Sequence, residues 1–170
     1  MIDWDTIVAQ HGPDVWRTAY RLVSDREQAN DCYQETFLQA VAYARRHQVE
    51  NWGSVLKRIA TARAIDCLRR RYRRGAAPLA GEGPVDRREQ LPEQPAEMRE
   101  WMDQFRAALT QLPERQAEAF WLCEVELLGR EEVARRLDSS SRQVAVWLHR
   151  GKRKLRKLMA AVGIENKVQP

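Results

Sequence analysis

Residues 112–158 decide the fold of the last third of the chain: LPERQAEAFWLCEVELLGREEVARRLDSSSRQVAVWLHRGKRKLRKL. Apolar residues recur there at helical spacing, which predicts three helices, the last two joined as a helix-turn-helix. Pro113 suits the first position of the first of these helices, and Ser140 or Ser141 can cap the last one. The last helix is apolar along one stripe and basic elsewhere, a pattern that suits contact with a polyphosphate backbone.

A second basic run, over residues 69–74, lies at the end of an earlier predicted helix. The chain has 170 residues and a formal net charge of only +5, because 24 acidic residues offset 29 basic ones. The placement of the charge is therefore more informative than its sum. A solvated helix face explains one basic run, but two runs at the ends of amphipathic helices favour a protein that touches DNA in two places.

The first part of the chain also has its apolar residues at helical spacing. A short first helix is expected to end at Gly12-Pro13, with a second helix after it. Ser24 and Glu27 form a capping-box pattern that predicts the start of a third helix, and Ser54 can cap a fourth. No segment alternates with period two over a useful length, so no strands are predicted and the fold class is all-α.

Glycine and proline punctuate a polar stretch between about residues 75 and 95, where no periodicity is visible. Such a composition is typical of a linker. We therefore expect an all-α protein of two small helical domains joined by a flexible linker, the second a helix-turn-helix domain. The expected boundaries are residues 1–75, 76–95 and 96–170.

Several classes of protein are disfavoured. No run of about 18 apolar residues is present, so no membrane span is expected, and the acidic N-terminus does not resemble a signal peptide; a cytoplasmic protein is expected. Cys32, Cys67 and Cys123 are scattered without a CxxC pair and are expected to be small buried residues, so neither a metal nor a cofactor is predicted. The chain has no GxxxxGK[ST] or HExxH motif and no catalytic residues are assigned, so an enzyme is not expected.

Several stretches, taken together and in order, resemble a known family. The chain looks like a sigma factor of the sigma-70 class, in the compact extracytoplasmic-function (ECF) group. The stretches that carry the resemblance are DREQANDCYQETF (25–37), RIA (58–60), AIDCLRR (64–70), LPERQ (112–116), EEVA (131–134) and LHRGK (148–152). The resemblance implies a first domain that binds RNA polymerase and the minus-ten promoter element, and a second that binds the minus-thirty-five element.

The resemblance also implies roles for individual residues. Core RNA polymerase would be the partner, through its β′ clamp helices and β flap, with promoter DNA; an anti-sigma factor is a further candidate partner. The implied polymerase-binding residues are Asp31, Gln34 and Glu35. The implied DNA-binding residues are Arg63, Arg69, Arg70, Arg142, Gln143, Ala145, Val146, His149, Arg150, Lys152 and Arg153.

The sequence departs from the family pattern in the recognition helix, where Gln143, Ala145 and Trp147 stand in place of the common Thr, Lys and Arg. Gln143 can still read adenine and Ala145 can contact a thymine methyl, so the departures leave the promoter sequence open. Trp147 is expected to pack on its own domain. Trp52 is expected in the core, with the alternative that it lines a pocket for a flipped promoter base.

Two other functions compete with a sigma factor. A helix-turn-helix regulator that acts without polymerase would explain the second domain but not the polar and acidic helix of the first. An adaptor that binds polymerase without promoter specificity would explain the altered recognition helix.

Overall fold

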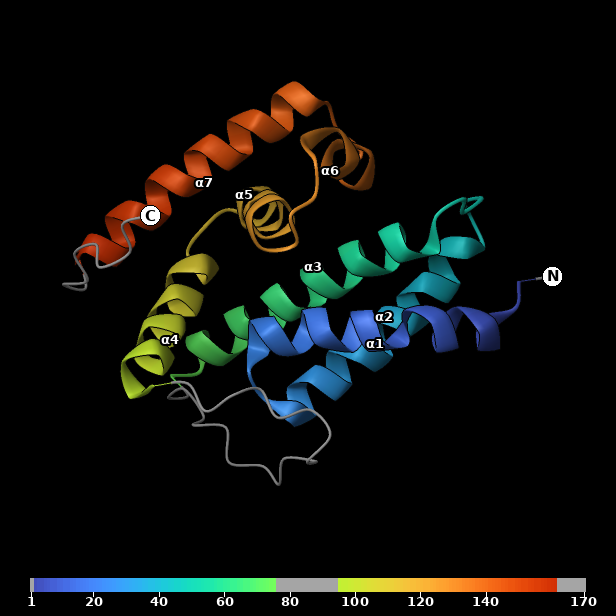
Figure 1. The fold of residues 1–170 in the computed structure, drawn as a ribbon, viewed down its shortest axis with the longest axis horizontal. Helices are drawn as coiled ribbons and strands as arrows, with labels where there is room; N and C mark the ends of the chain where they lie inside the picture. The colour runs from blue at the N-terminus through green and yellow to red at the C-terminus, as the bar shows by residue number, and fades with distance from the viewer. Residues whose placement is uncertain (1, 76–94, 162–170) are drawn as a thin grey trace.

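The computed structural model describes residues 2–75 and 95–161, and both segments are helical. The elements are α1 (Trp4–Val23), α2 (Arg26–Ala44), α3 (Trp52–Arg73), α4 (Ala96–Thr110), α5 (Glu114–Phe120), η1 (Trp121–Val125), α6 (Arg130–Arg136) and α7 (Ser141–Ala161). Figure 1 shows α1, α2 and α3 packed together, with α5, α6 and α7 on the α3 side of this group. The predicted all-α fold is confirmed, and α6 and α7 form the predicted helix-turn-helix. Residues 76–94, nearly all of the predicted linker, lie outside the described residues.

Helix α1 runs through Gly12-Pro13, so the expected break there is wrong. A proline inside a helix removes one backbone hydrogen bond. Ile7 before the proline and Val15 after it are nevertheless buried in the same apolar cluster, together with Leu56 of α3. Packing of both parts of α1 against the same core outweighs the local preference for a break.

The caps of α2 and α3 fall one and three residues from the predicted positions. Asp25, rather than Ser24, caps α2 by accepting a hydrogen bond from the backbone N–H of Gln28 at 2.8 Å. Asn51, rather than Ser54, caps α3, and the Ser54 N–H is its donor at 2.9 Å. Each position offered more than one side chain that can cap a helix. Spacing alone did not select the correct one.

The second half of the chain is built around the contact of α7 with α5. Gly151 of α7 is buried there, and a Cβ atom at this position would lie 3.2 Å from the backbone oxygen of Gln116. Trp147 is half-buried against the cluster that includes Leu122, Val133 and Val144, which confirms that it packs on its own half. A π-helical turn, η1, which the sequence pattern did not predict, follows α5.

The two halves share one hydrophobic core in the described structure. Leu22 and Leu68 from the first half lie in the same buried cluster as Leu109 and Trp121 from the second. Trp52 is half-buried at the other end of α3, where its ring meets that of Trp4 edge to face at 4.9 Å between centroids. No helix within residues 2–75 and 95–161 has the length and apolar character needed to cross a membrane.

The C-terminus of α1 is held by two buried arginines, one from each half. Arg71 of α3 donates to the carbonyl oxygen of Val23 at 2.8 Å, and Arg106 of α4 donates to that of Leu22 at 2.8 Å. The last carbonyls of a helix lack partners within the helix, and guanidinium groups satisfy them here. Arg71 was predicted in a basic run facing DNA, but it is only 7% exposed and serves the core.

Candidate polymerase and DNA interfaces

The residues predicted to bind polymerase lie on one exposed face of α2. Asp31 and Gln34 are exposed and Glu35 is half-buried. Leu38, one turn further on, is 71% exposed although it is a large apolar residue. Positions 31, 34, 35 and 38 have the spacing of a single helix face, and the opposite face buries Ala29 and Thr36 among other residues. We call the residues Asp31, Gln34, Glu35 and Leu38 the α2 face; the sequence analysis missed Leu38.

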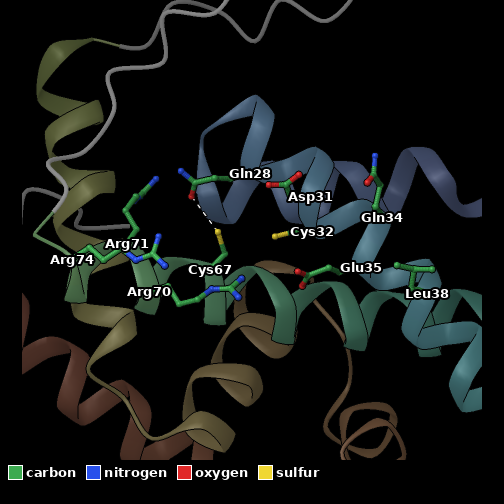
Figure 2. Close-up of a pocket in the computed structure, with 10 residues that line it drawn as sticks. All are labelled: Gln28, Asp31, Cys32, Gln34, Glu35, Leu38, Cys67, Arg70, Arg71 and Arg74. Atoms are coloured by element: carbon green, nitrogen blue, oxygen red, sulfur yellow. Dashed lines mark hydrogen bonds between the residues drawn. The ribbon is translucent and has the colours of Figure 1, made fainter.

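The α2 face borders a groove of about 580 Å³ between α2 and α3 (Figure 2). Glu35 and Asp31 lie on the α2 side, and Arg70 and Arg74 lie on the α3 side. The groove therefore has one acidic wall and one basic wall. The complete lining is Gln28, Asp31, Cys32, Gln34, Glu35, Leu38, Cys67, Arg70, Arg71 and Arg74.

The three arginines predicted to bind DNA from α3 divide between two sides of that helix. Arg63 and Arg69 both pair with Asp66, with nitrogen–oxygen distances of 2.9 and 3.6 Å. Arg69 also donates to the carbonyl oxygen of Leu112 in the second half, at 3.0 Å. Arg70 instead lines the groove beside α2. The family resemblance implied one DNA-binding role for all three, but only Arg63 and Arg69 lie on the same side of α3.

The second half covers part of α3 through two glutamates that the sequence analysis did not single out. The side chain of Glu126, which follows η1, is 4% exposed. Its carboxylate pairs with Lys57 of α3 at 3.1 Å and accepts a hydrogen bond from Thr18 of α1 at 3.2 Å. Glu132 of α6 accepts a hydrogen bond from Ser54 of α3 at 2.9 Å. Long-range contacts of this kind leave no periodic signal in a sequence.

Glu132 is fixed by three donors. Arg135 and Arg136 of the same helix also pair with its carboxylate, Arg136 at 3.1 Å. The hydrogen bond from Arg135, with those from Ser54 and Arg136, holds the pKa of Glu132 below its usual value. The same carboxylate thus joins α6 to the start of α3 through the hydrogen bond from Ser54.

The predicted recognition helix, α7, presents its first turn to solvent. Arg142 and Gln143 are exposed there. The hydroxyl oxygen of Ser140 accepts a hydrogen bond from the Gln143 N–H at 3.1 Å, so Ser140 is one of the two caps that the sequence offered. Ala145 and Val146 are half-buried.

The predicted phosphate-binding residues lie further along α7. His149, Arg150 and Arg153 are exposed. Lys152 is half-buried and pairs with Glu124 of η1 at 2.7 Å. Lys152 would therefore have to exchange a protein carboxylate for a phosphate, whereas the exposed Arg153 forms no ion pair within the described residues. No group of three or more potential metal ligands occurs within the described part of the chain.

Comparison with known proteins places both halves in one family. Residues 7–74 match sigma-70 region 2, and residues 102–155 match sigma-70 region 4. The chain is 33% identical over 161 residues to an ECF RNA polymerase sigma factor, SigE, of Mycolicibacterium smegmatis. The match covers 94% of this chain but only 63% of that relative.

A solved structure has a similar fold. The sigma factor RpoE of Bartonella quintana, determined in complex with the anti-sigma factor NepR, superposes with a TM-score of 0.56 at 19% identity. The superposition covers 96% of this chain and 99% of RpoE. The order of region 2 and region 4, together with the SigE match, leads to one conclusion. The chain belongs to the sigma-70 family, in its ECF group.

Proposed function

We propose that this chain is an ECF-type sigma factor that binds core RNA polymerase and directs promoter recognition and transcription initiation. The observation that carries the proposal is the pairing of an exposed polar face on α2, within region 2, with an exposed first turn of α7, within region 4. On this proposal the chain is not an enzyme. It acts in the cytoplasm, where it meets polymerase and DNA.

Polymerase docking is proposed to use the α2 face. Asp31 and Glu35 supply negative charge, and Leu38 supplies apolar area beside it. A basic partner helix, such as those of the polymerase β′ clamp, would complement this surface. The β flap is the second polymerase contact that the family implies, through the second half of the chain.

Promoter binding is proposed to use α7 and α3. The exposed first turn of α7 would enter the major groove at the minus-thirty-five element, with Arg142 and Gln143 at the base edges. Arg150 and Arg153 would meet phosphates. On α3, Arg63 and Arg69 would meet the minus-ten region, and this step requires Arg69 to leave the Leu112 carbonyl.

An anti-sigma factor is a further proposed partner class. RpoE of Bartonella quintana was determined in complex with such a protein. Any partner that stabilises the contacts of α3 with the second half would keep Arg63 and Arg69 from DNA.

Run-off transcription with purified core polymerase and genomic promoter fragments tests the proposal. We expect transcripts with defined starts only when the chain is added to core enzyme. Binding to duplex DNA without core enzyme, and without transcripts, would favour the stand-alone regulator. Binding to core enzyme that yields no promoter-specific transcript would favour the adaptor.

A further inference from the structure

The groove beside the α2 face contains two cysteines that the fold brings together from distant parts of the sequence. Cys32 lies on α2 and Cys67 on α3, both line the same groove, and the two thiols are close enough for each to shift the pKa of the other. Figure 2 shows both sulfur atoms in the groove, between the acidic residues of α2 and the arginines of α3. Both were expected to be isolated buried residues. Only Cys32 is fully buried, at 2% exposure, whereas Cys67 is half-buried and lines the groove.

The surroundings of the two thiols differ in a way that assigns them different roles. The hydrogen bond from Cys32, helped by the positive charge of Arg70, lowers the pKa of Cys67 to about 7. The same hydrogen bond, together with burial, raises the pKa of Cys32 far above its usual range. The carboxylate of Glu35 adds to this effect on Cys32. Cys67 can therefore react as a thiolate near neutral pH, whereas Cys32 stays protonated.

Two other groups in the groove act on Cys67. The side-chain oxygen of Gln28 accepts a hydrogen bond from the Cys67 thiol at 3.2 Å, which favours the protonated form. Arg71 acts in the opposite direction, as a nearby positive charge. The charged residues that line the groove are Asp31 and Glu35 from α2 and Arg70, Arg71 and Arg74 from α3.

We propose that Cys32 and Cys67 form a peroxide-reactive dithiol site, in which Cys67 is the attacking thiol and Cys32 the resolving one. The Cys67 thiolate attacks one oxygen of a hydroperoxide such as hydrogen peroxide. A sulfur–oxygen bond forms, the oxygen–oxygen bond breaks, and the leaving hydroxide takes a proton to become water. Cys32 then attacks the sulfur of the Cys67 sulfenic acid. The disulfide forms, the sulfur–oxygen bond breaks, and the Cys32 proton leaves with the hydroxide as a second water, so two thiols supply the two electrons.

The disulfide would lie at the base of the groove beside the α2 face. A disulfide holds its two Cβ atoms about 3.5–4.5 Å apart, so it would fix α2 against α3 at this point of the groove. The carboxylates of Asp31 and Glu35 would then be held beside Arg70, which lines the same groove, and would be less available to a basic partner. Oxidation should therefore weaken docking of polymerase. This consequence rests on the proposed function, whereas the chemistry of the dithiol site does not.

The chemistry is tested on the full chain with hydrogen peroxide, alkylation of the remaining thiols and peptide mass spectrometry. We expect a peptide linked through Cys32 and Cys67, with Cys123 still alkylated. Cys32→Ser should leave a sulfenic acid on Cys67 that dimedone traps, and Cys67→Ser should give neither product. Cys123→Ser is the matched control and should form the disulfide as the wild type does, because burial and Glu124 raise the pKa of Cys123.

Two readouts are specific to the assignment of Cys67. Its alkylation rate in the Cys32→Ala, Cys123→Ser chain should rise with pH at a higher midpoint than in the Cys123→Ser chain, because alanine has no donor to replace the Cys32 thiol. Arg70→Gln should also move the midpoint upwards. Equal peroxide reactivity of Cys67 and Cys123, or a linked peptide that includes Cys123, would overturn the proposal.

The expected effect of oxidation on polymerase docking is tested with the Cys123→Ser chain, whose affinity for core polymerase is measured in the reduced and in the oxidised form. We expect weaker binding after oxidation, restored by dithiothreitol, and no response to peroxide in the chain that also carries Cys32→Ser and Cys67→Ser. Equal binding of the two forms would overturn the consequence. If the reduced chain itself does not bind core enzyme, the proposed function fails, and the linked peptide alone then decides the dithiol site.

Discussion

Arg69 of α3 donates a hydrogen bond from Nη2 to the carbonyl oxygen of Leu112, at 3.0 Å, and thereby joins region 2 to region 4. Arg69 is one of the residues proposed to meet promoter DNA. Its side chain is 19% exposed, and its guanidinium also pairs with Asp66 at 3.6 Å. In this closed arrangement the second half of the chain covers the part of α3 around Arg69. DNA can reach Arg69 only if the two halves separate there.

Glu126→Gln should loosen the closed arrangement. The buried carboxylate accepts from Thr18 and pairs with Lys57, and its loss leaves the Lys57 ammonium without that partner. The expected cost to the contact between the halves is about 1–3 kcal/mol. Small-angle scattering should report a larger radius of gyration, and the urea midpoint should fall. Asp14→Asn is the control, because it removes an ion pair exposed to solvent on both sides; an equal response of the two variants would contradict the assignment.

Residues 1–75 and 96–170 should each fold as a helical unit when expressed alone. Each contains its own helix packing, but the cluster around Leu68 and Leu109 is shared. We therefore expect helical circular dichroism from both fragments, with melting temperatures below that of the full chain. In limited proteolysis of the full chain the first cut should fall within residues 76–95, on the basis of their Pro/Gly-rich sequence. A first cut inside 26–46 or 113–125 would count against two domains.

Sequence reasoning predicted the elements whose apolar spacing is strong. The helices that became α6 and α7 were predicted with the turn between them, because apolar residues recur at helical spacing in each. Val133 of α6 and Val144 and Leu155 of α7 are among these residues, and all three are buried. The break predicted at Gly12-Pro13 was wrong because local sequence does not show the core that buries α1 on both sides of the proline. Tertiary packing outweighs local preference at such positions.

The candidate site could be predicted only in part. Three residues of the α2 face, Asp31, Gln34 and Glu35, were implied by the family resemblance, whereas Leu38 was not predicted. The burial of Arg71, the pairing of Cys32 with Cys67 and the carboxylate of Glu126 were not found. Each depends on a contact between residues distant in sequence. The pattern of residues within one helix does not show which other helix will pack against a given face.

Gly151→Val should destabilise the second half. A Cβ atom at position 151 would lie 3.2 Å from the backbone oxygen of Gln116 and 3.4 Å from a methyl carbon of Leu112, so α7 could approach α5 less closely. Overpacking of this kind costs about 1–3 kcal/mol, to be measured as a lower midpoint of urea unfolding. Gly129→Ser is the control, because nothing lies within 4 Å of its Cβ position and serine suits the start of α6. An unchanged midpoint for Gly151→Val would show that the two helices can move apart freely.

Asp31→Arg should weaken binding to core RNA polymerase. Asp31 is exposed on the α2 face. The change replaces a negative charge that would attract a basic partner helix with a positive charge that would repel it. Co-purification with core enzyme, followed by titration, should show reduced affinity at unchanged helical content. Glu100→Arg alters the net charge equally at an exposed position of α4 and should bind as the wild type does. If Asp31→Arg binds like this control, docking uses another face.

The last prediction separates attraction to phosphates from reading of bases. Arg153 is exposed on α7, and neutralising it should weaken holoenzyme binding evenly across promoter sequences and reduce the log–log salt slope by about 0.9. Lys152→Ala should reduce the slope by less, because Lys152 already pairs with Glu124 at 2.7 Å. Gln143→Ala, in the exposed first turn, should instead change the preference at one base position by about 1–3 kcal/mol.

Binding of these variants to a promoter library over a salt series distinguishes the two roles. The salt slope reports phosphate contacts whatever the sequence, and the ranking of promoters reports base contacts at any one salt concentration. The assignment fails if Gln143→Ala weakens every promoter alike while Arg153→Ala reorders them. A wild-type holoenzyme without sequence preference at the minus-thirty-five element would leave α7 as a phosphate-binding helix and favour the adaptor, because the bases would then contribute no free energy to distinguish promoters.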